Sequence, residues 1–111
     1  MWMKSTVLFI MLLWTLPSSA SNYAQDVGII SKVYVSATGT VALQMRGGRA
    51  GIPQAVAKYP CVSSNGWVGH FQADSVLKSA ILMAKSAGSN VTVTTQGCEG
   101  EWFKILDIYI N

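Results

Sequence analysis

The stretch DSVLKSAILMAKSAGSNVTVTTQ, residues 74–96, decides the fold that the sequence predicts. Asp74 is a favourable N-cap, since its carboxylate can accept bonds from first-turn amides, and Gly88 is a natural residue just after a helix. A helix is therefore predicted over 74–87 and an alternating strand over 90–96. The buried helix face is expected to hold Val76, Ala80, Met83 and Ala87, with Leu77, Ile81 and Ala84 beside them.

Further strands are predicted on both sides of this unit. Residues 27–35 and 40–46 alternate around a turn at 36–39, which is typical of a hairpin. A third strand is predicted over 67–71 and a fifth over 102–110. Residues 47–60 are rich in glycine and proline and are expected to form a long irregular loop. The apolar sets expected to share a face are Val27, Ile29, Val33 and Val35 in the first strand and Val41, Leu43 and Met45 in the second.

The order strand, strand, strand, helix, strand, strand indicates a mostly β protein with one helix. A helix between the third and fourth strands is the connectivity of the OB-fold, a five-stranded Greek-key barrel. An open α+β sheet with the helix on one face is the alternative that the pattern leaves open.

The first twenty residues are typical of a secretory signal peptide, with Lys4, an apolar run over 7–16 and small residues before a cleavage site after Ala20. Residues 21–111 are then one domain, in a secreted or periplasmic protein. Their formal net charge is +2, because Lys4 accounts for one of the eight Lys and Arg residues. This mild and unclustered charge argues against nucleic acid as a partner. No second apolar stretch predicts membrane insertion.

Cys61 and Cys98 are the two cysteines of the chain. In an oxidising compartment a single pair has one possible internal connectivity, so a disulfide is predicted. The bridge would close a loop of about 37 residues and stabilise the fold by roughly 4 kcal/mol in the chain-entropy model. Two free thiols or an intermolecular bridge are the alternatives. A zinc site needs about four ligands, and two cysteines with one histidine do not supply them, so no metal or other cofactor is expected.

Several of these residues together carry a family resemblance. The elements are Cys61 with Trp67 six positions later, the helix end and strand over 80–93, Cys98, and the final Ile108-Tyr109-Ile110. This pattern resembles small secreted bacterial OB-fold proteins and, more distantly, the B subunits of toxins of the subtilase-cytotoxin and typhoid-toxin type. The resemblance implies an OB-fold, assembly into a ring of like subunits and binding of sialylated glycans.

Catalytic arrangements are weak in this sequence. His70 and Asp74 lie four residues apart near Ser63 and Ser64, but a triad is recognised by geometry, and no G-x-S-x-G motif is present. Glu99 and Glu101 are expected in a solvated turn. We therefore expect a protein that acts by binding and is not an enzyme.

Ligand contacts are predicted on strands two and three and their flanking loops, the usual binding face of an OB-fold. Gln44 and Arg46 project opposite the apolar residues of their strand, and arginine can bind a carboxylate or stack on a ring. The predicted contacts with a glycan or small anionic ligand are Gln44, Arg46, Arg49 and Tyr59. Trp67 alternates with Phe71 across Gly69, which favours burial.

The last predicted strand has two apolar faces, and one core does not obviously accommodate both. Phe103, Ile105 and Tyr109 form a row that the helix, the long loop or a second subunit could cover. Two functions follow. The first is a glycan-binding subunit of a ring-forming, toxin-like assembly. The second is a monomeric secreted or periplasmic protein that binds a small ligand or a protein partner.

Overall fold

The computed structural model describes residues 22–111, so the predicted signal peptide and its cleavage site lie outside the described residues. The elements are β1 (Ala24–Val35), β2 (Val41–Met45), a 3-10 turn η1 (Gly48–Gly51), α2 (Pro53–Lys58), β3 (Val68–His70), α3 (Ser75–Ala87), β4 (Asn90–Glu99) and β5 (Trp102–Ile110). The chain is thus mostly β with one main helix, as the sequence predicts. In this part of the chain no helix is long and apolar enough to span a bilayer.

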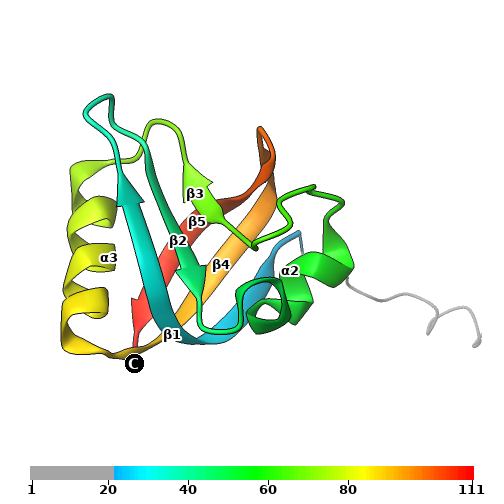
Figure 1. Cartoon of the computed structure of the whole chain (residues 1–111), viewed down its shortest axis with the longest axis horizontal. Helices are drawn as coiled ribbons and strands as arrows, with labels where there is room; N and C mark the ends of the chain where they lie inside the picture. The colour runs from blue at the N-terminus through cyan, green and yellow to red at the C-terminus, as the bar shows by residue number, and fades with distance from the viewer. Residues whose placement is uncertain (1–21) are drawn as a thin grey trace, which may run out of the picture.

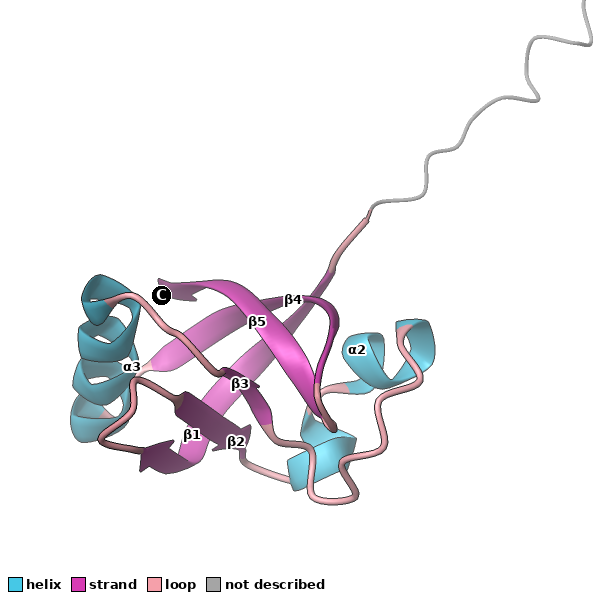
Figure 2. Ribbon diagram, turned by 90° about the horizontal axis from the view of Figure 1, so that it is seen from above, coloured by secondary structure: helices cyan, strands magenta, loops and turns pink. Residues whose placement is uncertain are grey.

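The five strands pair in the order β1-β2-β3-β5-β4, and β4 also pairs with β1, so the sheet closes into a barrel. All neighbours are antiparallel except β3 and β5, which run parallel over a short segment. Figures 1 and 2 show α3 and α2 at opposite ends of the barrel. The last strand therefore lies between the third and fourth in space, although it follows both along the chain.

The expected irregular loop over 47–60 is wrong in part, because η1 and α2 form within it. Pro53 stands at the first helical position, where its missing N–H is not needed. The buried carboxylate of Asp26 in β1 accepts the N–H groups of Gln54 at 2.9 Å and Ala55 at 3.1 Å. Ile52 and Ala55 enter the core. A carboxylate 28 residues earlier in the sequence thus holds the start of α2 on the barrel.

The face predicted for β1 is wrong at its ends. Residues 24, 26 and 30 are buried, and the register then shifts between Ile30 and Lys32. This bulge changes which residues face inward, so Val33 packs on the core while Val27 is 61% exposed and Val35 is also exposed. In β2 the predicted face is confirmed, since Val41, Leu43 and Met45 are fully buried.

Helix α3 begins and ends where the sequence predicts. The Asp74 side chain accepts the N–H of Val76 at 2.9 Å, and Gly88 adopts a left-handed conformation after the last turn. The buried face differs from the expected one. Ile81 and Ala84 are buried and Leu77 packs on the core, whereas Val76 is 73% and Met83 62% exposed. The helix is rotated so that the secondary predicted stripe faces the barrel.

Strand β5 has the predicted bounds, but its apolar row does not lie on one face. Phe103 and Ile105 are buried in the barrel core, and Tyr109 is exposed. Thr94 pairs with Asp107 and Thr95 with Ile105, so an extra residue, Leu106, bulges outward. Phe103 and Ile105 are therefore not available to a second subunit, since one core accommodates them.

Candidate functional site

Four aromatic side chains gather on the outside of the barrel and are here called the aromatic surface: Tyr34, Trp67, Phe71 and Trp102. Trp102 is central, with its ring centroid 6.3 Å from Tyr34, 6.2 Å from Trp67 and 5.5 Å from Phe71. Tyr34 and Phe71 meet it edge-on, at interplanar angles of 72° and 66°. These separations are in the range of favourable aromatic pairs. The rings come from β1, the two ends of β3, and β5.

A row of small residues creates room for this surface. The register pairs Tyr34 with Ala42, Ala42 with Gly69, and Gly69 with Lys104, across β1, β2, β3 and β5. A Cβ atom at Gly69 would lie 2.9 Å from Cε3 of Trp102, so the indole occupies the space that a side chain at this position would take. Glycine inside a strand often marks such a close approach. The flat outer face of β2 and β3 is thus covered by the Trp102 ring.

The aromatic surface remains accessible to a ligand. Tyr34 is 47% and Phe71 43% exposed, while Trp67 and Trp102 are half-buried. The expected burial of Trp67 is therefore met only in part. Large exposed aromatic rings are uncommon in a solvated sheet face and are frequent at binding surfaces, because they bury much area at little cost in side-chain freedom.

Charged groups border the surface beside Phe71. The Glu99 carboxylate accepts the Phe71 N–H at 3.0 Å through Oε2. The same oxygen lies 3.7 Å from Nδ1 of His70, and Oε1 lies 4.0 Å from Nζ of Lys104. The side chain of Glu99 is 18% exposed. Hydrogen-bond donors and acceptors therefore stand at the edge of an apolar platform.

The predicted contact residues are divided by the structure. Gln44 pairs with Lys32, two positions along the ladder from the pair of Tyr34 and Ala42. Gln44 is therefore on the same face of the sheet as these residues and lies beside the aromatic surface. Arg46 is exposed just after β2. Tyr59 lies elsewhere: it packs on the core, and its hydroxyl donates to the carbonyl of Asn22 at 2.8 Å.

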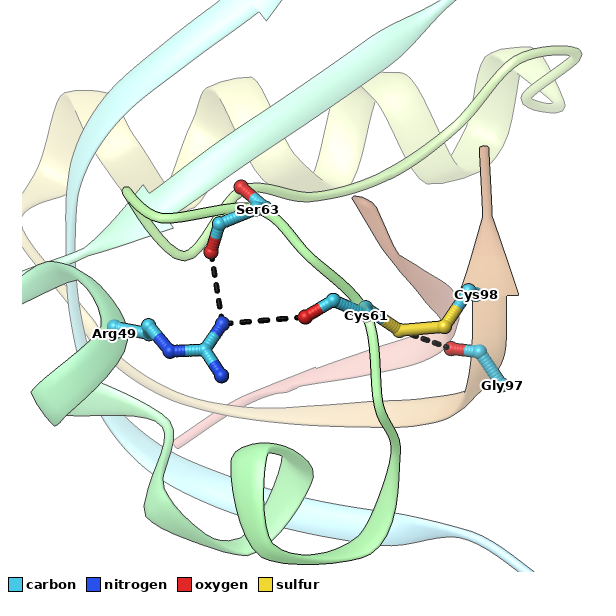
Figure 3. Close-up of a disulfide and its surroundings, with 5 residues drawn as sticks. All are labelled: Arg49, Cys61, Ser63, Gly97 and Cys98. Atoms are coloured by element: carbon cyan, nitrogen blue, oxygen red, sulfur yellow. Dashed lines mark hydrogen bonds between the residues drawn. A yellow bond between two sulfur atoms is a disulfide. The ribbon is translucent and has the colours of Figure 1, made fainter. Parts of the chain in front are cut away.

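Arg49 has a structural position. Its guanidinium donates to the carbonyl oxygens of Cys61 at 3.3 Å and Ser63 at 2.8 Å, as Figure 3 shows. Its Cζ also lies 5.7 Å from the ring centroid of Phe103. The arginine thus holds the segment that leads into β3 and is not directed to the aromatic surface.

The predicted disulfide between Cys61 and Cys98 is confirmed, with the two Cα atoms 5.6 Å apart. Cys61 is buried and precedes β3, and Cys98 lies within β4, which extends beyond the predicted end at residue 96. Figure 3 shows the bridge joining these two segments beside Arg49. The bridge therefore fixes the strand end that carries Glu99 to the segment that carries Trp67.

The hydroxyl and carboxylate groups considered for catalysis have separate partners. Ser63 Oγ accepts the N–H of Trp67 at 3.0 Å, and Asp74 caps α3. His70 faces Glu99. Glu101 is exposed in the turn before β5. Across residues 22–111 no three His, Cys, Asp or Glu residues are grouped so as to hold a metal ion.

A shallow, open cleft lies between the start of β1 and α2. Its lining combines an exposed tyrosine ring, two amide side chains and a lysine over two alanines: Tyr23, Ala24, Gln25, Gln54, Ala57 and Lys58. The amide of Gln25 also donates to Thr94 Oγ1 at 3.1 Å. This cleft is a second place at which a small polar molecule could bind.

The sequence reasoning missed Tyr34, Phe71 and Trp102 as site residues. The sequence signal that could have found them is the pair of small residues Ala42 and Gly69. Small residues on the outer face of a sheet indicate that a large side chain packs over them. Comparison with protein-family models, with curated protein sequences and with solved structures gave no match.

Proposed function

We propose that this chain is an exported, non-catalytic binding protein whose aromatic surface binds a carbohydrate. The carrying observation is the cluster of half-exposed rings around Trp102, bordered by Glu99 and Lys104. A sugar ring presents a C–H face that packs on an aromatic ring and hydroxyl groups that need donors and acceptors at its edge. The aromatic surface and its charged border offer both.

The proposed fold is the OB-fold. The pairing order β1-β2-β3-β5-β4, with α3 between β3 and β4 along the chain, supports this assignment. OB-folds bind oligosaccharides and oligonucleotides on the face of strands 2 and 3. The aromatic surface covers that face here.

A carbohydrate fits better than a single-stranded nucleic acid, which would also stack on aromatic rings. Nucleic-acid sites combine stacking with a positively charged groove along the backbone. In this chain Lys32 and Lys104 flank the aromatic surface, but Lys104 faces the carboxylate of Glu99. Salt-dependent binding of oligonucleotides would contradict the proposal.

The toxin-like ring belongs to the same proposal and rests on the resemblance. Of the row predicted as an interface, Tyr109 remains exposed. It lies on the outer face across Thr92 from Val27, which is also exposed. Light scattering of the protein at micromolar concentration tests the ring: the mass of one chain would end it and leave the carbohydrate proposal standing.

The alternative function is that of a monomer that binds a small ligand or a protein partner. The open cleft between β1 and α2 is the observation that favours it. Binding of a small molecule that survives changes at Tyr34 and fails after Gln54→Ala would support this alternative.

The test of carbohydrate binding uses a glycan array and two matched variants. Tyr34→Ala removes an exposed ring from the aromatic surface, and Tyr23→Ala removes a similarly exposed ring from the cleft between β1 and α2. We expect Tyr34→Ala to weaken glycan binding by about 1–2 kcal/mol, roughly 5- to 30-fold, and Tyr23→Ala to leave it unchanged. Equal effects in both variants, or no retained glycan with the wild-type protein, would overturn the proposal.

A further inference from the structure

His70 and Glu99 contact the backbone just after β3. The backbone N–H of Gln72 donates to Nδ1 of His70 at 3.1 Å, a contact that requires Nδ1 to be an acceptor without a proton. The same Nδ1 lies 3.7 Å from Oε2 of Glu99, which accepts the N–H of Phe71 at 3.0 Å. Two consecutive backbone amides, those of Phe71 and Gln72, are therefore held by His70 and Glu99.

We propose that protonation of His70 releases Phe71 and so weakens binding at the aromatic surface under mildly acidic conditions. A protonated Nδ1 is a donor, so it can no longer accept the Gln72 N–H. The carboxylate oxygen nearest to Nδ1 is Oε2 of Glu99, which accepts the Phe71 N–H in the structure. The new charge-assisted bond draws Oε2 of Glu99 toward His70, where it competes with the Phe71 N–H, while the Gln72 contact is lost outright. Histidine is the side chain whose charge ordinarily changes between about pH 5 and 8.

The consequence reaches Trp102 through the Phe71 ring. This ring contacts Trp102 on one side, and on another it lies against Gly100, where a Cβ atom would be 2.8 Å from its Cζ. Because the ring is closely packed, a movement of the Phe71 backbone also moves the ring. Acidification thus changes the accessible edge of the aromatic surface. This effect on ligand binding rests on the proposed function, whereas the rearrangement does not.

The charged groups around His70 are few. Glu99 reaches it from β4, and Lys104 from β5 lies 4.0 Å from the other oxygen of that carboxylate. Asp74, at the start of α3, caps its own helix through the Val76 N–H, and Glu101 is exposed in the turn between β4 and β5. A protonated His70 and Lys104 would therefore both face the one carboxylate of Glu99.

The test needs no ligand. Two-dimensional ¹H–¹⁵N spectra of the whole chain are recorded between about pH 8 and pH 5. We expect the amide signals of Phe71 and Gln72 and the indole signal of Trp102 to move together, with the midpoint of the His70 ring. His70→Asn keeps an acceptor near the position of Nδ1 but cannot gain the proton, so these coordinated shifts should be lost.

The variant Glu99→Gln separates the protonation of His70 from the change at Phe71 and Trp102. His70 should still titrate in this variant, while the Phe71 and Trp102 signals should no longer follow it. Signals of Phe71 and Trp102 that stay constant while His70 titrates in the wild-type protein would overturn the proposal. If His70→Asn loses signal dispersion, the comparison of wild type with Glu99→Gln decides alone. A failed glycan array leaves these spectra unaffected, so the two proposals fail separately.

Discussion

The indole of Trp102 lies against the backbone of Gly69, at a point where a Cβ atom would be 2.9 Å from Cε3 of the ring. The contact joins the start of β5 to the middle of β3, two strands that pair in parallel over only a short segment. It also places Trp102 where Tyr34 and Phe71 can reach it. A single position without a side chain thus fixes the centre of the aromatic surface.

Gly69→Ala should destabilise the fold by about 1–3 kcal/mol. The new Cβ would lie 2.5 Å from the carbonyl oxygen of Val41 and 2.9 Å from both Ala42 Cβ and the Trp102 ring, and backbone cannot yield as a flexible side chain does. Gly28→Ala is the control, because its Cβ would meet only the terminal methyl of Met45, at 3.2 Å. The control should change stability by less than about 1 kcal/mol. Urea unfolding of both variants measures the difference, and equal midpoints would contradict it.

Asp26→Asn should cost about 1–3 kcal/mol. The carboxylate accepts two backbone N–H groups at the start of α2, whereas an amide offers one acceptor oxygen and an unwanted NH2 donor group in its place. Asp107→Asn removes the same charge at an exposed position and should be neutral. Hydrogen exchange of the α2 amides should accelerate in the first variant alone. Protected α2 amides in Asp26→Asn would show that the cap is not needed.

Arg49→Ala should lower stability by about 1–3 kcal/mol, since it removes the donor to the carbonyls of Cys61 and Ser63. Arg46→Ala, a matched change at an exposed neighbour, should leave stability unchanged. The sequence predicts that both arginines contact a ligand, whereas in the structure Arg49 contacts the backbone of its own chain. Thermal unfolding of the pair distinguishes the two roles. If both variants unfold at the same temperature as the wild-type protein, Arg49 does not stabilise the fold.

Phe103→Asp should abolish folding rather than dissociate an assembly. The Phe103 side chain has no exposed surface. Burying an unpaired carboxylate in its place costs more free energy than the free energy of unfolding of a small domain, roughly 5–15 kcal/mol. Leu106→Asp places the same charge three residues away on the outward bulge, and it should fold. Circular dichroism of both variants is sufficient. A folded Phe103→Asp protein would mean that this ring is not in the core.

Replacing Cys61 and Cys98 together by Ala should cost about 2–5 kcal/mol, as is typical when a native disulfide is removed from a small secreted domain. Thiol labelling of the denatured, unreduced wild-type protein should find no free cysteine. Two labelled thiols per chain would contradict the pairing.

Local signals in the sequence determined the elements whose ends depend on neighbouring residues. Asp74 and Gly88 set the ends of α3 because a cap bonds within its own first turn and a glycine can take the left-handed conformation after the last. The alternation of β2 and the bounds of β5 are local in the same sense. The cysteine pair was determined by number alone, since two cysteines allow one internal bond.

Only the tertiary structure decided which side chains face inward and which of them meet. Each strand with an unexpected face, β1 and β5, contains a bulge, and one extra residue reverses every later side chain of a two-residue repeat. Helix α2 depends on Asp26, which is distant in sequence. The aromatic surface depends on β5 pairing with β3, which brings Trp102 over Gly69. No local pattern specifies these contacts, because the contacting residues are distant in sequence and meet only when the strands pair in the closed barrel.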